Sequence, residues 1–107
     1  MCDGGVDADQ LPNGYGEFGL SPNNPIPCQS LLGQRMYLDR LRTANNTKVI
    51  YRRIGSFFSD VCKYPIDGYA LLDTKGNTLE TIYISAYQKR NSCKSPKNFY
   101  LANNLYS

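Results

Sequence analysis

Side chains that commonly carry chemistry are few in this chain of 107 residues. It has no histidine, the residue used most often for general acid–base catalysis and for activating cysteine or serine nucleophiles. Zinc sites pair cysteines roughly two to four residues apart, whereas the four cysteines here are widely separated, at Cys2, Cys28, Cys62 and Cys93. We therefore expect no catalytic residue, no metal site, no cofactor and no enzymatic activity.

The most informative stretch for function is YISAYQKRNSCKSPKNFYL, residues 83–101. It interleaves basic side chains with tyrosine and phenylalanine and contains no acidic residue. Such bases can neutralise phosphates, and aromatic rings can stack on nucleobases. Tyrosine and arginine also serve protein interfaces well. Together with two arginines of a predicted strand, the candidate binding residues are Arg52, Arg53, Tyr83, Tyr87, Lys89, Arg90, Lys94 and Lys97.

Two function classes fit these residues, a protein-interaction module and a nucleic-acid-binding domain. None of the standard nucleic-acid-binding motifs is present, and the isoelectric point of 8.7 lies below the strongly basic range of dedicated nucleic-acid domains. We therefore expect a non-catalytic domain that binds another macromolecule, most often a protein. Nucleic-acid binding through the basic and aromatic residues is the alternative.

The charge of the chain is distributed unevenly. Residues 1–34 contain four acidic residues and no basic one, whereas residues 35–107 contain 12 basic residues and five acidic ones. An acidic N-terminal part next to a basic body can fold back on that body, or can leave it free for an anionic partner.

The length fits a single domain. Glycine, aspartate and a lack of periodicity predict a mobile acidic leader over residues 1–10. Residues 11–107 then form one small domain, which begins with an extended arm rich in proline and glycine over residues 11–29. Because the arm carries spaced apolar residues, we expect it to lie on the domain, where it could cover a sheet edge.

Hydrophobic periodicity predicts one helix and about three strands. A helix is expected over 31–43, with Leu31, Tyr37, Leu38 and Leu41 on one side. A strand is expected over 48–54, and a hairpin with strands 69–72 and 79–87 is joined by a turn at 73–77. The predicted fold class is α+β, with a small antiparallel sheet.

The predicted location is the cytoplasm. The first ten residues lack the basic and apolar regions of a secretory signal, and no apolar run approaches 18 residues. We therefore expect no contact with a membrane. In the cytoplasm the four cysteines would be thiols.

Five segments together resemble a group of small uncharacterised bacterial proteins. They are NPIP at 24–27, YLDRLR at 37–42, YRRIGS at 51–56, IDGY at 66–69 and YISAYQKRNS at 83–92. The resemblance covers most of residues 14–92 and implies a bacterial protein in which these segments form one structural unit. Members often have histidine where this chain has Arg52 and Gln88. The group has no assigned activity, so the resemblance implies no mechanism. Within the unit, we expect Arg53 to pair with Asp67 or Asp39.

Overall fold

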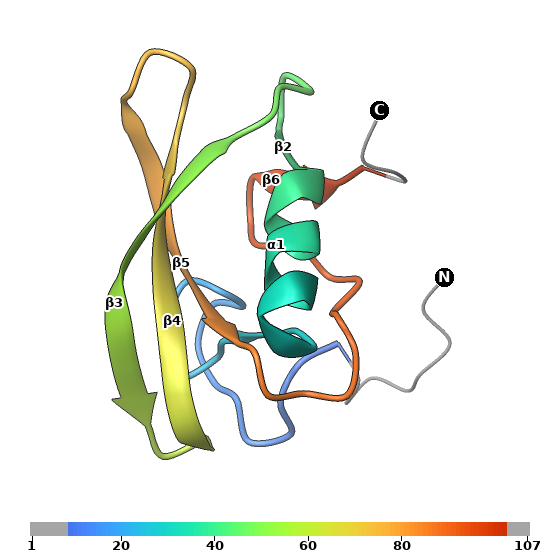
Figure 1. The fold of residues 1–107 in the computed structure, drawn as a ribbon, viewed down its shortest axis with the longest axis vertical. Helices are drawn as coiled ribbons and strands as arrows, with labels where there is room; N and C mark the ends of the chain where they lie inside the picture. Colours follow the sequence, from blue (N-terminus) through green and yellow to red (C-terminus); the bar gives the residue numbers. More distant parts are fainter. Residues whose placement is uncertain (1–8, 103–107) are drawn as a thin grey trace.

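The computed structural model describes residues 9–102, which form one helix packed on one side of a mixed four-stranded sheet (Figure 1). The α+β class is therefore as predicted. The sheet has the strand order β1-β5-β4-β3, and a separate two-stranded ribbon pairs β2 with β6. Both sheets include segments that the sequence pattern did not assign to strands.

Three long antiparallel strands form the body of the sheet: β3 (Ile50–Ser59), β4 (Cys62–Leu72) and β5 (Thr78–Ser85). The predicted hairpin is β4 and β5, with its turn at 73–77. There the Asp73 carboxylate accepts hydrogen bonds from the backbone N–H groups of Lys75 and Asn77, both at 2.9 Å. Gly76 adopts a φ of 89°, which glycine tolerates best.

The predicted sheet of about three antiparallel strands is too small. Strand β1 (Ile26–Pro27) belongs to the proline-rich arm and pairs in parallel with the end of β5, so that Ile26 lies beside Ile84. Proline removes a backbone donor and is tolerated at the edge of a sheet, which is where β1 lies. The arm thus contributes the fourth strand.

The helix is shorter than predicted. Helix α1 runs over Ser30–Arg40, and the chain then turns into strand β2 (Leu41–Thr43), which pairs with β6 (Phe99–Leu101). Arg42 lies just after the end of the helix. Its guanidinium donates to the carbonyl oxygens of Asp39 at 2.8 Å and Leu41 at 3.0 Å. These carbonyls lie at the end of the helix, where no later turn supplies a donor.

The core lies between α1 and the sheet. Gln34, Tyr37 and Leu38 are buried on the helix, facing a cluster that includes the buried Ile82 and Ile84 of β5. Leu31, which the periodicity placed on the same stripe, is exposed because it lies in the first turn, beside a groove rather than over the core. On the opposite face of the sheet, the Phe57 and Tyr83 rings meet edge to face, with centroids 5.2 Å apart.

Candidate functional site

The predicted binding residues do not form one patch. Arg53 and Arg52 are adjacent on β3, and side chains alternate along a strand, so they lie on opposite faces of the sheet. Arg53 lines a groove next to α1, whereas Arg52 is exposed on the other face, which also carries Tyr83. Lys89 is exposed in the loop after β5.

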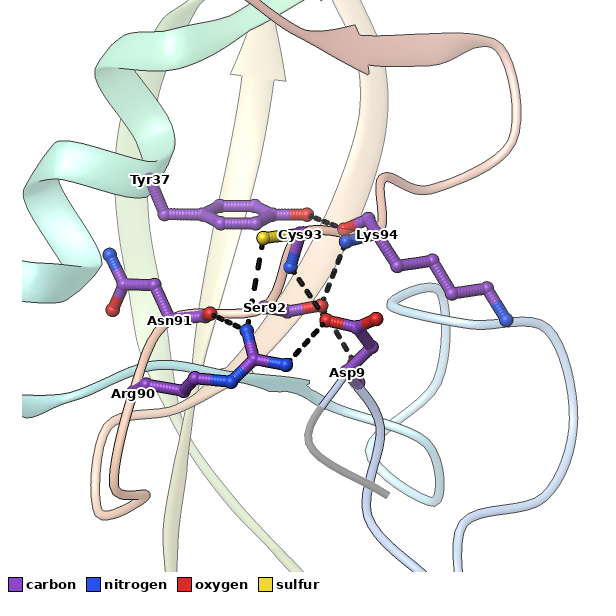
Figure 2. Close-up of polar contacts among 7 residues, drawn as sticks. All are labelled: Asp9, Tyr37, Arg90, Asn91, Ser92, Cys93 and Lys94. Atoms are coloured by element: carbon purple, nitrogen blue, oxygen red, sulfur yellow. Dashed lines mark hydrogen bonds and ion pairs between the residues drawn. The ribbon is translucent and has the colours of Figure 1, made fainter. Parts of the chain in front are cut away.

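Arg90 takes part in a polar cluster that joins Asp9, the first described residue, to the loop after β5 (Figure 2). The Asp9 carboxylate accepts hydrogen bonds from the Arg90 guanidinium at 3.2 Å and from the backbone N–H of Cys93 at 2.9 Å. The Ser92 hydroxyl donates to the Asp9 carbonyl oxygen at 2.7 Å. Asp9 was expected in the mobile leader, but it is anchored here. The rest of that predicted leader, residues 1–8, lies outside the described part of the chain.

The cysteines differ from the expectation of four thiols. Cys93 takes part in a disulfide, while Cys28 and Cys62 are free. Cys28 is buried, and burial raises the pKa of its thiol far above the ordinary value. The nearby Tyr37 is also buried, and burial raises the pKa of its hydroxyl, which donates to the Lys94 carbonyl oxygen at 2.6 Å.

Lys94 and Lys97 lie together in a second place, a pocket of about 630 Å³ between the arm and the loop before β6. The Lys94 ammonium donates to the Gln10 side-chain oxygen at 3.1 Å and sits 4.9 Å from the centre of the Phe18 ring. Glu17 lines the same pocket. The carboxylate offsets part of the positive charge, so this pocket is a weak site for an anion.

Two further predicted residues, Arg53 and Tyr87, line a separate groove of about 750 Å³, here called the α1–β3 groove. It opens between the first two turns of the helix and the strands β3 and β4. Its lining residues are Leu31, Leu32 and Arg35 of α1, Arg53 and Ser56 of β3, Pro65, Asp67 and Tyr69 of β4, and Tyr87.

A bulge in β3 shapes the floor of this groove. Residues three apart in a regular strand face opposite sides. The register between β3 and β4 shifts between Arg53 and Gly55, however, and this brings Arg53 and Ser56 to the same side. The Arg53 guanidinium donates to the Ser56 hydroxyl at 2.7 Å and to the Asp67 carboxylate at 3.0 Å. Of the two partners expected for Arg53, Asp67 is the one observed; Asp39 accepts from the Tyr51 hydroxyl instead.

The wall of the groove formed by the helix is apolar and positively charged. Leu31 and Leu32 are 70% and 69% exposed, unusually open for leucines in a small domain. Arg35, one turn further along, forms no hydrogen bond or ion pair with any residue in 9–102. The groove therefore offers apolar contact area next to an arginine that has no direct ion-pair partner within residues 9–102.

The floor also carries tyrosines. Tyr87 is 57% exposed, and its ring stacks on that of Tyr64 with centroids 4.6 Å apart. Tyr69 is held by the buried Gln34 side-chain amide, which donates to its hydroxyl. Stacking fixes the exposed Tyr87 ring, so it presents contact area at a small cost in conformational entropy. The hydrogen bond from Gln34 fixes the buried Tyr69.

Sequence reasoning missed the helix wall of the site. Leu31 was assigned to the apolar stripe of the helix. Leu32, a large apolar residue that lies off this stripe, was given no role. A large apolar residue beside a complete stripe is the one signal that could have indicated the groove. Asp67 and Tyr69 could not be recognised as neighbours of α1, because no local pattern reports which strand faces the helix.

Comparison of the chain with protein-family models, curated proteins and solved structures finds no match. Within residues 9–102, no group of three or more cysteine, aspartate or glutamate side chains is arranged to hold a metal ion. No helix in that range is long and apolar enough to cross a membrane.

Proposed function

We propose that this protein is a non-catalytic protein-interaction module and that its binding surface is the α1–β3 groove. The observation that carries the proposal is the exposure of Leu31 and Leu32 beside Arg35, which forms no ion pair within residues 9–102. Exposed apolar groups that line a concavity with polar groups at its rim are typical of protein-binding sites.

The composition of the groove supports this proposal. Arginine and tyrosine are enriched where proteins bind one another, and in the groove they flank leucine and proline. The side chains that hold the floor in place, Gln34 and Asp67, are bound within the protein. A partner therefore meets a surface that is already arranged.

The distribution of cations favours this function over nucleic-acid binding. A nucleic-acid surface needs several cations along one track. Here Arg90 is paired with Asp9, and Lys94 and Lys97 share a pocket with Glu17. Arg52 and Arg53 lie on opposite faces of the sheet.

The test is a selection of peptides from a random library displayed on phage, against the immobilised protein and against two variants. Leu32→Glu places a charge in the groove, and Leu79→Glu places the same charge on an exposed leucine of β5 outside it. Both positions are exposed, so the variants should fold, and circular dichroism checks this. We expect sequences that bind the wild type and Leu79→Glu but not Leu32→Glu. Failure to enrich any sequence, or equal enrichment on Leu32→Glu, would refute the proposal.

Nucleic-acid binding has its own measurement. A fluorescent single strand and a duplex of mixed sequence are titrated at several salt concentrations. Micromolar binding whose logarithm falls steeply with the logarithm of the salt concentration would replace the proposed function with the alternative.

The cellular compartment is a separate question. The sequence predicts the cytoplasm, but the disulfide of Cys93 favours an oxidising compartment, because cytoplasmic thiols are kept reduced. Trapping the thiols with a maleimide before lysis of the source cells distinguishes the two. Labelling of Cys93 without prior reduction would support the cytoplasm.

A further inference from the structure

One side of β3 is free next to the α1–β3 groove. Strand β3 is the last strand of its sheet, and across residues 9–102 it pairs only with β4. It is 10 residues long. An unpaired strand of this length leaves a row of backbone N–H and C=O groups available to another extended chain.

The groove and the free edge share residues. Arg53 and Ser56 belong to β3, and their side chains line the groove floor, while Leu31, Leu32 and Arg35 face them from the helix. A chain that pairs with β3 would therefore project every second side chain into the space between β3 and α1. We propose that the groove binds an extended peptide segment by addition of a strand to the β3 edge, a known mode of peptide recognition. This inference rests on the proposed function.

The charges of the groove identify the peptide's chemistry. Arg35 and Arg53 contribute two positive charges, and Asp67, ion-paired with Arg53, contributes one negative charge. An acidic side chain on the peptide would supply the missing counter-charge. The exposed Leu31 and Leu32 require apolar side chains on the same face of the peptide. Because side chains on one face are two residues apart, apolar and acidic side chains alternate with outward-facing residues, as in the sequence apolar-x-acidic-x-apolar.

The probe is an acetylated octapeptide amide, Thr-Leu-Thr-Glu-Thr-Leu-Thr-Thr, with fluorescein on its C-terminal side, and binding is measured by fluorescence polarisation. A second probe moves the glutamate one residue along, which turns it to the opposite face. A third replaces it with glutamine. We expect both changes to weaken binding roughly two- to fivefold, the range of a partly exposed ion pair.

Backbone pairing is tested with two further probes that carry N-methyl groups on alternate residues. In a strand, alternate N–H groups point to the same side, so only one of the two probes should lose its hydrogen bonds to β3. We expect that probe to bind about tenfold or more weakly, since several hydrogen bonds are lost together. The other should bind within a factor of about two.

Charge reversal links the acidic position to Arg35. Arg35→Glu should weaken the glutamate probe and strengthen a matching lysine probe, whereas Arg52→Glu changes the net charge equally on the other face and should do neither. If peptide binding requires Leu32 but both N-methylated probes bind as tightly as the unmodified probe, strand addition is overturned and the proposed function stays intact. A selection with no dependence on Leu32 would remove both. Concentration-dependent dimerisation through β3 that excludes the probe would overturn the peptide as occupant.

Discussion

At the scale of single residues, two arginines that are adjacent in the sequence play different parts in the groove. Arg52 and Arg53 are neighbours, yet only Arg53 reaches the groove, where Ser56 and Asp67 orient it. Its side chain is 51% exposed and that of Asp67 is 16% exposed, so water screens much of the pair's attraction. Arg53 therefore matters more for the shape and charge of the groove than for the stability of the fold.

We expect Arg53→Met to lower the free energy of unfolding by less than about 1 kcal/mol, as for other solvent-screened ion pairs. Urea denaturation measures the change, with Arg52→Met as the matched control. Binding of the groove-selected peptides should weaken in Arg53→Met alone. Unchanged unfolding and unchanged binding together would mean that the pair with Asp67 has no role.

The two free cysteines should differ in reactivity. Burial raises the pKa of Cys28, so its reactive thiolate is scarce at neutral pH, whereas Cys62 is partly exposed. We expect iodoacetamide to modify Cys62 in the folded protein and Cys28 only after denaturation, as read by peptide mass spectrometry. The raised pKa also means that the thiol form favours the folded state, so this contribution is lost as the pH rises above the ordinary thiol pKa. Rapid labelling of Cys28 in the native protein would contradict the buried core position.

At the scale of elements, the parts that could be predicted were those with a local signal. The β4–β5 hairpin followed from alternation and from the Asp73-to-Asn77 turn, and Tyr37 and Leu38 followed from helical spacing. The last predicted helical turn became β2, because Leu41–Thr43 pairs with β6, almost 60 residues away. Likewise Ile26–Pro27 became a strand only because the end of β5 lies beside it. Contacts of this range leave no pattern in a local window.

The β4–β5 turn should depend on pH. Hydrogen bonds from Asn77 and Lys75 to the Asp73 carboxylate lower its pKa below the ordinary value. A lowered folded-state pKa gives stability that is present above the unfolded pKa, close to 3.8, and is lost as the pH falls through the folded value. We expect Asp73→Ala to be less stable than the wild type at neutral pH, with the difference shrinking below about pH 4. Thermal unfolding from pH 7 to pH 2 measures this. A difference that persists at pH 2 would assign the effect to backbone conformation.

The junction of α1 and β2 should be sensitive to loss of Arg42, which is 1% exposed. Arg42→Met leaves the buried carbonyl oxygens of Asp39 and Leu41 without their charged donor. We expect a loss of about 1.5–3 kcal/mol in the free energy of unfolding, the range for hydrogen bonds to charged groups. Arg40→Met is the control for the neighbouring, partly exposed arginine. Equal effects of the two substitutions would contradict a special role for Arg42.

At the scale of the whole molecule, the structure separates anchoring from binding. Asp9, which precedes the arm, is tied to the loop after β5 through Arg90 and Ser92, next to the disulfide of Cys93 (Figure 2). The α1–β3 groove lies elsewhere and keeps Arg35 without a partner among residues 9–102. The basic and aromatic stretch at residues 83–101 thus contains residues that anchor the N-terminal segment, such as Arg90, and residues that border the groove, such as Tyr87.

The α1–β3 groove is the proposed binding surface, and peptide binding there can be mapped residue by residue. The most direct measurement is an NMR titration of the ¹⁵N-labelled protein with the octapeptide probe, following backbone amide chemical shifts. We expect the shifts to change along the first two turns of α1, along β3 and at Tyr87, and to stay unchanged in Leu32→Glu. Changes centred on Lys94 and Lys97, or no changes at millimolar peptide, would contradict it.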